Sequence, residues 1–247
     1  MIPTLNESDS LPHVLSLVPD VYEVLLVDGN STDDTIAVAR SLRPDIRILT
    51  QPGTGKGDAL RFGFSAARGD IIVAIDADGS TDPREIPAFV GALLAGADYV
   101  KGTRFAPGGG TSDMTRIRKI GNWGFVVLVR ILFRKRYTDF NYGYTAFWKQ
   151  VLPVLDLKSH GFEIECEMNL RAAITKLRVV EVASFERLRV GGQAHLRTFR
   201  DGWRVLKELV RQYRRRLHAP SARPRGASHL VPELPHAARI VGELSPE

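Results

Sequence analysis

Two carboxylates at the end of one apolar run constrain this chain more than any other feature. Residues 71–75 are apolar and mostly β-branched, and Asp76 and Asp78 lie at the end of this run. Such a run is typical of a buried strand in a parallel sheet, and open α/β sheets bind ligands outside the carboxyl ends of their strands. An extended backbone points both acids to one side because they are two residues apart. The stretch therefore predicts an α/β fold with a site at Asp76 and Asp78.

The chemistry expected at this site is divalent-metal binding. Mg²⁺ or Mn²⁺ takes one or two carboxylates and completes its coordination with water and phosphate oxygens. The alternative is a plain acidic turn that closes the strand, because Asp and Gly are common turn residues. Other parts of the chain have to decide between these two interpretations.

Strand and helix patterns alternate before and after this run. Apolar, strand-like segments lie at residues 21–27 and 46–49, and helix-like segments lie at 35–42 and 58–67. This alternation is typical of a doubly wound parallel sheet. A chain of 247 residues is long enough to build such a domain around a full hydrophobic core.

Composition narrows the classes of protein and of partner. The single cysteine, Cys166, excludes internal disulfides and cysteine-based metal clusters and favours a reducing, cytoplasmic setting. No signal peptide is visible, and no apolar run approaches the roughly 18 residues of a spanning helix. The net charge of +6 indicates an anionic partner. We do not expect nucleic acid, because the basic residues cluster on one terminal segment without aromatic residues interleaved on a sheet.

Two phosphate-handling motifs come close to matching. A P-loop around Lys56 would need glycine at position 50 and Ser or Thr at 57, where the chain has Thr50 and Gly57. A glycine turn that carries Lys56 can still approach a diphosphate. The strand and its Asp-x-Asp-Gly also resemble the nucleophile motif of haloacid-dehalogenase-like phosphatases. That motif normally lies on the first strand of its domain, whereas here it lies on the fourth.

Five motifs occur together in a fixed order. They are Pro-Thr-Leu-Asn-Glu at 3–7, Val-Asp-Gly-Asn-Ser-Thr-Asp-Asp-Thr at 27–35, Gly-Lys-Gly at 55–57, Asp-Ala-Asp-Gly at 76–79 and Lys-Gly-Thr-Arg-Phe at 101–105. With them the chain resembles the family 2 nucleotide-sugar glycosyltransferases of the GT-A fold, most closely the polyprenyl and dolichyl-phosphate sugar transferase branch. The resemblance covers residues 1 to about 200. It implies a Rossmann-like, mostly parallel central sheet flanked by helices, in a single catalytic domain.

The resemblance also implies how a UDP- or GDP-sugar donor is bound. The base and ribose would be contacted by Pro3, Glu7 and Asp28. Lys56 would lie near the donor, and Asp76 near the ribose or the metal. Asp78 would hold the Mg²⁺ or Mn²⁺ ion that bridges the diphosphate.

The acceptor is expected on the second half of the chain. Residues 138–147 resemble the acceptor-side motif of the family, which makes Asp139 the expected catalytic residue. Asp139 would be a general base for a hydroxyl acceptor, or would orient an ionised lipid phosphate or the metal; a buried structural acid is the alternative. A lipid phosphate or glycan acceptor would be bound by Arg104, Glu165 and Arg189. The loop at 106–113 is interpreted either as a lid or as a connector.

The most regular helix pattern lies at residues 198–217. Six apolar residues recur every three or four positions beside a basic stripe; they are Phe199, Trp203, Leu206, Val210, Tyr213 and Leu217. The basic stripe consists of Arg197, Arg200, Arg204, Lys207, Arg211 and Arg214. This pattern is typical of an interfacial helix that brings an enzyme to a membrane. The alternative is a helix packed on the domain with a solvated basic face.

These expectations combine into one organisation. Residues 1–105 form a nucleotide-sugar-binding half, 106–196 an acceptor-binding half, 197–217 a basic amphipathic helix and 218–247 a disordered tail. The expected activity is inverting sugar transfer by metal-assisted single displacement, in a cytoplasmic protein peripheral on the inner face of the plasma membrane. A phosphatase-like hydrolase and a non-catalytic sugar-nucleotide-binding module are the alternatives.

Overall fold

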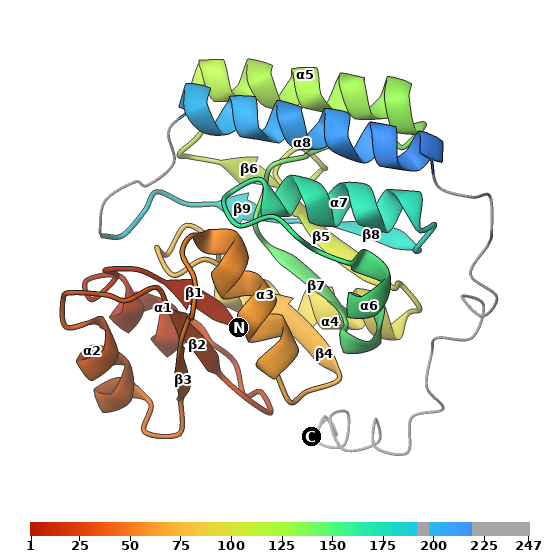
Figure 1. Cartoon of the computed structure of the whole chain (residues 1–247). Coiled ribbons are helices and arrows are strands. Elements are labelled where there is room, and N and C mark those ends of the chain that lie inside the picture. Colours follow the sequence, from red (N-terminus) through yellow and green to blue (C-terminus); the bar gives the residue numbers. More distant parts are fainter. Residues whose placement is uncertain (192–197, 219–247) are drawn as a thin grey trace, which may run out of the picture.

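The computed structural model describes residues 1–191 and 198–218 (Figure 1). Its first part alternates strands with helices, as the sequence predicts. The elements are β1 (Ile2–Thr4), α1 (Leu11–Leu17), β2 (Leu25–Asp28), α2 (Thr35–Leu42), β3 (Arg47–Thr50), α3 (Lys56–Ala66) and β4 (Ile71–Ala74). The strand predicted at 21–27 is wrong in its first part, because regular pairing begins only at Leu25.

The second part adds strands and the longest helices. These elements are α4 (Ile86–Leu94), β5 (Tyr99–Thr103), β6 (Gly110–Thr111), α5 (Arg116–Phe133), β7 (Thr145–Trp148), α6 (Leu152–Leu155), α7 (Ile164–Ile174), β8 (Val179–Ala183), β9 (Phe185–Glu186) and α8 (Thr198–His218). Short 3₁₀ turns at Pro83–Glu85 and Lys149–Val151 lead into α4 and α6. The tail predicted at 218–247 lies outside the described residues apart from His218, which ends α8.

The central sheet is mixed. Strands β1, β2 and β3 pair in parallel, and a second group has the order β4-β7-β5-β8. The two groups meet at Met1, whose amino group donates to the Val73 carbonyl at 2.8 Å and whose carbonyl accepts from the Ile75 N–H at 3.2 Å. The predicted α/β fold is confirmed. The run at 71–75 has one parallel and one antiparallel neighbour, because Met1 bonds to Val73 and Ile75 in the parallel pattern and β4 pairs antiparallel with β7.

Two hydrophobic clusters support this architecture. The larger one lies between the sheet and helices α1, α3, α4 and α7. The second lies between α5, α7 and α8 and includes Val129, Phe133, Leu170, Val205 and Leu209. Figure 1 shows α5 and α8 side by side at the top of the molecule with α7 beneath them. Helix α7 therefore lies between the sheet and the pair formed by α5 and α8.

Helix α8 has a buried face, an exposed apolar face and a basic face. Asp201, Val205 and Leu209 are buried against the domain. The predicted apolar stripe is a different face and stays largely exposed: Phe199 is 82% and Trp203 is 58% exposed. The helix therefore packs on the domain, as the alternative interpretation expects, and also presents an exposed apolar face. Its binding to a membrane stays a prediction. Arg197 of the basic stripe lies outside the described residues. No helix in the described part of the chain is long and apolar enough to cross a membrane.

Candidate functional site

One cavity of about 830 Å³ brings together most of the residues expected to bind substrates. Those that line it are Pro3, Glu7, Lys56, Asp76, Asp78, Arg104, Glu165 and Arg189. The acids come from neighbouring strand ends, because Glu7 follows β1 and the acid pair follows β4. Asp28 and Asp139 are not among its lining residues. The cavity lies where an α/β sheet is expected to bind ligands, outside the carboxyl ends of its strands.

Lys56 joins two carboxylates at the centre of this cavity. As the first residue of α3, it lies 2.7 Å from Asp76 Oδ1 and 2.6 Å from Glu165 Oε1 in the first turn of α7. Burial opposes the charge on Lys56, but the two carboxylates raise its pKa above the ordinary lysine value. Burial also raises the pKa of Asp76 to about 6, although the Lys56 ammonium acts in the opposite direction. Lys56 therefore stays protonated and fixes both acids.

Arg189 joins a second pair of carboxylates. Its guanidinium donates to Glu7 Oε1 at 3.0 Å and to Asp78 Oδ2 at 2.9 Å. The other oxygen of Asp78 accepts the Ser80 N–H at 2.9 Å. Burial raises the pKa of Glu7, although hydrogen bonds from Ser10 and Arg189 oppose this rise. Arg189 was expected at the acceptor, and the structure places it against the acid expected to hold the metal.

The acid pair suits a metal that is shared with a substrate. Asp76 and Asp78 both line the cavity and offer hard carboxylate oxygens. Within residues 1–191 and 198–218, no cluster of three or more His, Cys, Asp or Glu side chains is arranged to hold a metal ion. Mg²⁺ is commonly bound by one or two carboxylates together with substrate phosphates and water. The residues present therefore fit an ion that binds with a diphosphate.

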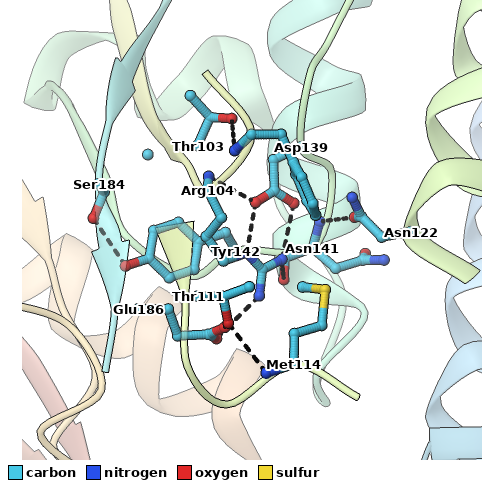
Figure 2. A network of polar contacts seen from close by, with 12 residues as sticks. Thr103, Arg104, Thr111, Met114, Asn122, Asp139, Asn141, Tyr142, Ser184 and Glu186 are labelled. Carbon is cyan, nitrogen blue, oxygen red and sulfur yellow. Dashed lines mark hydrogen bonds and ion pairs between the residues drawn. The ribbon is translucent and has the colours of Figure 1, made fainter. Parts of the chain in front are cut away.

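Asp139 is held away from the cavity by Arg104 (Figure 2). Its side chain is 0% exposed, and Arg104 donates to it from Nε at 2.6 Å and from Nη2 at 2.9 Å. Burial alone would raise the pKa of Asp139, but the hydrogen bonds and charge of Arg104 outweigh this and lower it. A low-pKa carboxylate with both oxygens occupied is poorly suited to accept a proton. The geometry does not fit the general base expected here; it fits the buried acid that was the alternative.

Arg104 is itself part of a wider network. Its Nη1 donates to Glu186 Oε1 at 3.0 Å, and its guanidinium lies 4.8 Å from the centre of the Tyr142 ring. Glu186 also accepts the hydroxyl hydrogen of Thr111 in the loop at 106–113 (Figure 2). Because β6 pairs with β9, this loop is anchored at Thr111. Arg104 is therefore oriented toward the cavity by two carboxylates.

Comparison with known proteins identifies the family. A model described as "Glycosyl transferase family 2" matches residues 1–155. The chain belongs to glycosyl transferase family 2. The match covers the strand ends that carry Glu7, Asp76 and Asp78, together with Arg104 and Asp139.

Two relatives of this family 2 chain are named as mannosyltransferases for lipid phosphates. The undecaprenyl-phosphate mannosyltransferase of Micrococcus luteus is 34% identical over 195 residues, which cover 74% of this chain and 80% of that protein. The dolichol-phosphate mannosyltransferase of Pyrococcus furiosus is 30% identical over 207 residues, covering 80% of this chain and 58% of its own. An uncharacterized glycosyltransferase of Mycobacterium tuberculosis is 45% identical over 104 residues, or 42% of this chain, and the matched stretch spans 47% of that relative.

The fold of this chain is similar to that of an enzyme of known structure. Glucosyl-3-phosphoglycerate synthase from Mycobacterium tuberculosis, solved with Mn²⁺, UDP-glucose and phosphoglyceric acid, superposes with a TM-score of 0.68. Its sequence is 22% identical, and the match covers 86% of this chain and 78% of that one. At this identity the likeness concerns the fold, and it confirms the predicted GT-A architecture of this family 2 chain.

Several residues lining the cavity were missed from the sequence. Gln51 is buried, and its Oε1 has no hydrogen-bond partner among the described residues. Arg118 and Asn122 reach the cavity from α5. The glycine turn beside Gln51 and the basic pattern of residues 116–136 were the available signals. Asp28, which was predicted, is buried; its Oδ2 accepts two backbone N–H groups, from residues 30 and 31.

The far end of the cavity is apolar. It is lined from α5 by Ile117 and Phe125, and from α8 by Phe199, Trp203 and Leu206. The cavity of this family 2 chain is therefore continuous from charged strand ends to a cleft between two helices.

Proposed function

We propose that this chain transfers a sugar from a nucleoside-diphosphate sugar to a polyprenyl phosphate. The observation that carries the proposal is the single cavity with one charged and one apolar end. A nucleotide sugar is polar throughout, whereas a polyprenyl phosphate joins an anionic head to a long hydrocarbon chain. The cavity offers each substrate a matching environment, and two of the named relatives are polyprenyl- and dolichol-phosphate mannosyltransferases.

The donor would occupy the charged end. Asp76 and Asp78 would hold Mg²⁺ or Mn²⁺ against the diphosphate, as the residue types at this end allow. A divalent ion there stabilises the negative charge that develops on the leaving diphosphate. Pro3 and Glu7 would contact the nucleoside, with Asp28 supporting the loop beneath it. Lys56 would fix Asp76 and Glu165 in place, since it binds both.

The acceptor phosphate would meet a group of arginines. Arg104, Arg118 and Arg189 line the same cavity. Guanidinium groups bind phosphate through charge-assisted, bidentate hydrogen bonds. Arg104 would act mainly through its positive charge, because Asp139, Glu186 and the Asn141 carbonyl already accept hydrogen bonds from its guanidinium.

The proposed reaction is an inverting single displacement. A phosphate oxygen of the acceptor attacks C1 of the sugar opposite the leaving group. As the new C1–O bond forms, the bond from C1 to the diphosphate breaks and its electron pair leaves with the nucleotide. A phosphate is already ionised at neutral pH, so this reaction needs no general base. The buried and paired state of Asp139 agrees with such an acceptor better than with a hydroxyl.

The outer surface of α5 and α8 would hold the enzyme on the membrane. Ile120, Trp123 and Ile131 of α5 are exposed, as are Phe199 and Trp203 of α8. Residues 116–133 contain four basic side chains and no acid. Exposed apolar residues flanked by basic ones are typical of helices that lie in the interface of an anionic membrane. We place the protein peripherally on the inner face of the plasma membrane.

A transfer assay tests the proposal. Purified protein, Mn²⁺ and undecaprenyl phosphate in detergent are incubated with UDP-, GDP- and dTDP-sugars, and the lipid-linked product is separated and counted. One donor is expected to give product, and EDTA is expected to abolish it. Asp78→Asn should lower the rate by about a hundredfold or more. Asp45→Asn is the matched control, because it removes an exposed acid outside the cavity.

The other candidate activities give different products. Release of inorganic phosphate without a lipid-linked sugar would indicate a phosphatase-like hydrolase. Nucleotide binding that raises the melting temperature without any transfer would indicate a binding module. Transfer to a soluble glycan with none to the lipid would place the reaction on a hydroxyl acceptor.

A further inference from the structure

We infer that the hydrocarbon chain of the acceptor runs through a passage between α5 and α8, and that Gly121 and Gly202 set its width. The inference rests on the proposed function and adds the residues that select the acceptor. The passage is the apolar end of the cavity already described. Its walls come from two helices that pack against each other (Figure 1).

Each glycine lies at the centre of a wall. On α5, Ile117, Gly121 and Phe125 are four residues apart and share one face of the helix. On α8, Phe199, Gly202 and Leu206 share a face in the same way, and all these residues line the cavity. Each glycine lies between two large apolar residues on its helix face. Each wall therefore has an opening at its glycine.

The space at these glycines is open. A Cβ atom added to Gly121 or Gly202 would meet no other atom within 4 Å. Glycine in a helix interior costs about 1 kcal/mol relative to alanine, and no crowding by a neighbour explains its presence here. Many other glycines of the chain are crowded: a Cβ on Gly57 would lie 2.4 Å from a backbone oxygen. Close packing therefore explains Gly57, whereas Gly121 and Gly202 border open space and also line the cavity.

The passage has an apolar mouth and a cationic inner end. Phe199, Trp203 and Ile117 line the cavity and are also among the exposed apolar residues of the surface. Arg118, whose side chain is 28% exposed, and the buried Arg104 line the same cavity. A polyprenyl phosphate matches this order, because its phosphate fits the arginines while its chain extends past the glycines to the surface. A free phosphate or sugar would leave the apolar walls without a partner.

The test compares long and short acceptors in three leucine variants. Gly121→Leu and Gly202→Leu fill the passage, and Gly124→Leu is the matched control. Gly124 lies on α5 with no atom within 4 Å of a Cβ, but it does not line the cavity. Leucine favours helix over glycine, so none of these changes is expected to unfold the protein. The acceptors are undecaprenyl phosphate and geranyl phosphate, a short prenyl phosphate.

The expected result is a loss that depends on the acceptor. Transfer to undecaprenyl phosphate should fall about tenfold or more in Gly121→Leu and Gly202→Leu. Transfer to geranyl phosphate and the melting-temperature shift caused by nucleotide with Mn²⁺ should stay within about twofold of wild type. Gly124→Leu should match wild type with both acceptors.

Three outcomes would overturn the inference. Unchanged transfer to the long acceptor would mean that its chain takes another path. An equal fall with both acceptors, or an equal fall in Gly124→Leu, would assign the glycines to helix packing. If wild type transferred sugar to neither prenyl phosphate, the proposed function would fail, and this result is seen before any variant is made.

Discussion

The two ends of the cavity are held together in opposite ways. At the charged end, Lys56, Arg189 and Arg104 each bind two carboxylates that come from distant parts of the chain. At the apolar end, two glycines leave open space and large apolar residues are exposed. Ion pairs thus fix the shape of the charged end before a substrate binds. At the apolar end, the open space exists because Gly121 and Gly202 have no side chains. Substitutions should therefore cost stability at the first end and lipid binding at the second.

The largest effect is expected where a cross-link is broken inside the protein. Asp139→Asn removes the charge that Arg104 binds at 2.6 Å. Arg104 then keeps Glu186 as its one carboxylate partner among the described residues. The free energy of unfolding should fall by about 3 kcal/mol, because removing one partner of a buried pair leaves the other poorly compensated. Urea denaturation measures the change. Asp45→Asn, in an exposed pair, should change it by about 0.5 kcal/mol or less; similar losses in both variants would contradict this explanation.

The same pair predicts a dependence on pH. The folded-state pKa of Asp139 is lowered below the unfolded value, which is about 3.9. Its contribution to stability is therefore complete above about pH 4 and is lost as the pH falls through the lower, folded-state value. The difference in unfolding free energy between wild type and Asp139→Asn should be constant from neutral pH to about pH 5 and shrink under stronger acid. A difference that grew on acidification would show that another group is responsible.

A smaller effect is expected at the mouth of the apolar end. The double variant Phe199→Ser and Trp203→Ser should weaken binding to anionic vesicles by about tenfold or more, since each side chain inserts apolar area. Its unfolding free energy should change little, because both residues are exposed. Tyr22→Ser is the control, because Tyr22 is 83% exposed but lies in the segment between α1 and β2, outside α5 and α8. An equal fall in co-sedimentation with vesicles in the double variant and in the control would contradict a role of α8 at the membrane surface.

The smallest effect separates the glycines of α5. Gly124→Ala should raise the unfolding free energy by about 0.5 to 1 kcal/mol, because alanine favours helix and the site is open. Sugar transfer should be unchanged. Thermal unfolding and the transfer assay measure the two quantities, and a loss of activity would extend the functional surface of α5 beyond the cavity wall.

Local patterns in the sequence predicted the acids of the site well. Asp76 and Asp78 follow an apolar run, and carboxyl ends of strands gather at one edge of a sheet, so their position follows from a short segment. The partner of Asp139 could not be predicted in this way. Its burial depends on Arg104, which lies 35 residues earlier and packs against it only in the folded chain.

The dependence on contacts between distant residues explains two other differences between the predicted and the observed structure. The run at 71–75 is apolar in either kind of sheet, and only the insertion of β7 beside β4 makes the pairing antiparallel. Helix α8 shows its apolar stripe clearly in the sequence, but the face that packs carries Asp201 beside Val205 and Leu209. Which face of a helix is buried depends on the surface that it meets, and here that surface is α5 and α7.

The ion pairs of the charged end also determine when this site forms as the chain is made. Arg189 lies 182 residues from Glu7 and 111 residues from Asp78 along the sequence. Contacts across such separations form late, because the entropy of closing a long loop is lost before the contact is gained. A chain emerging from the ribosome presents both acids long before their arginine. The charged end therefore closes only after nearly all of the sheet has been synthesised, so under the proposed function nucleotide binding is a sensitive reporter of complete folding.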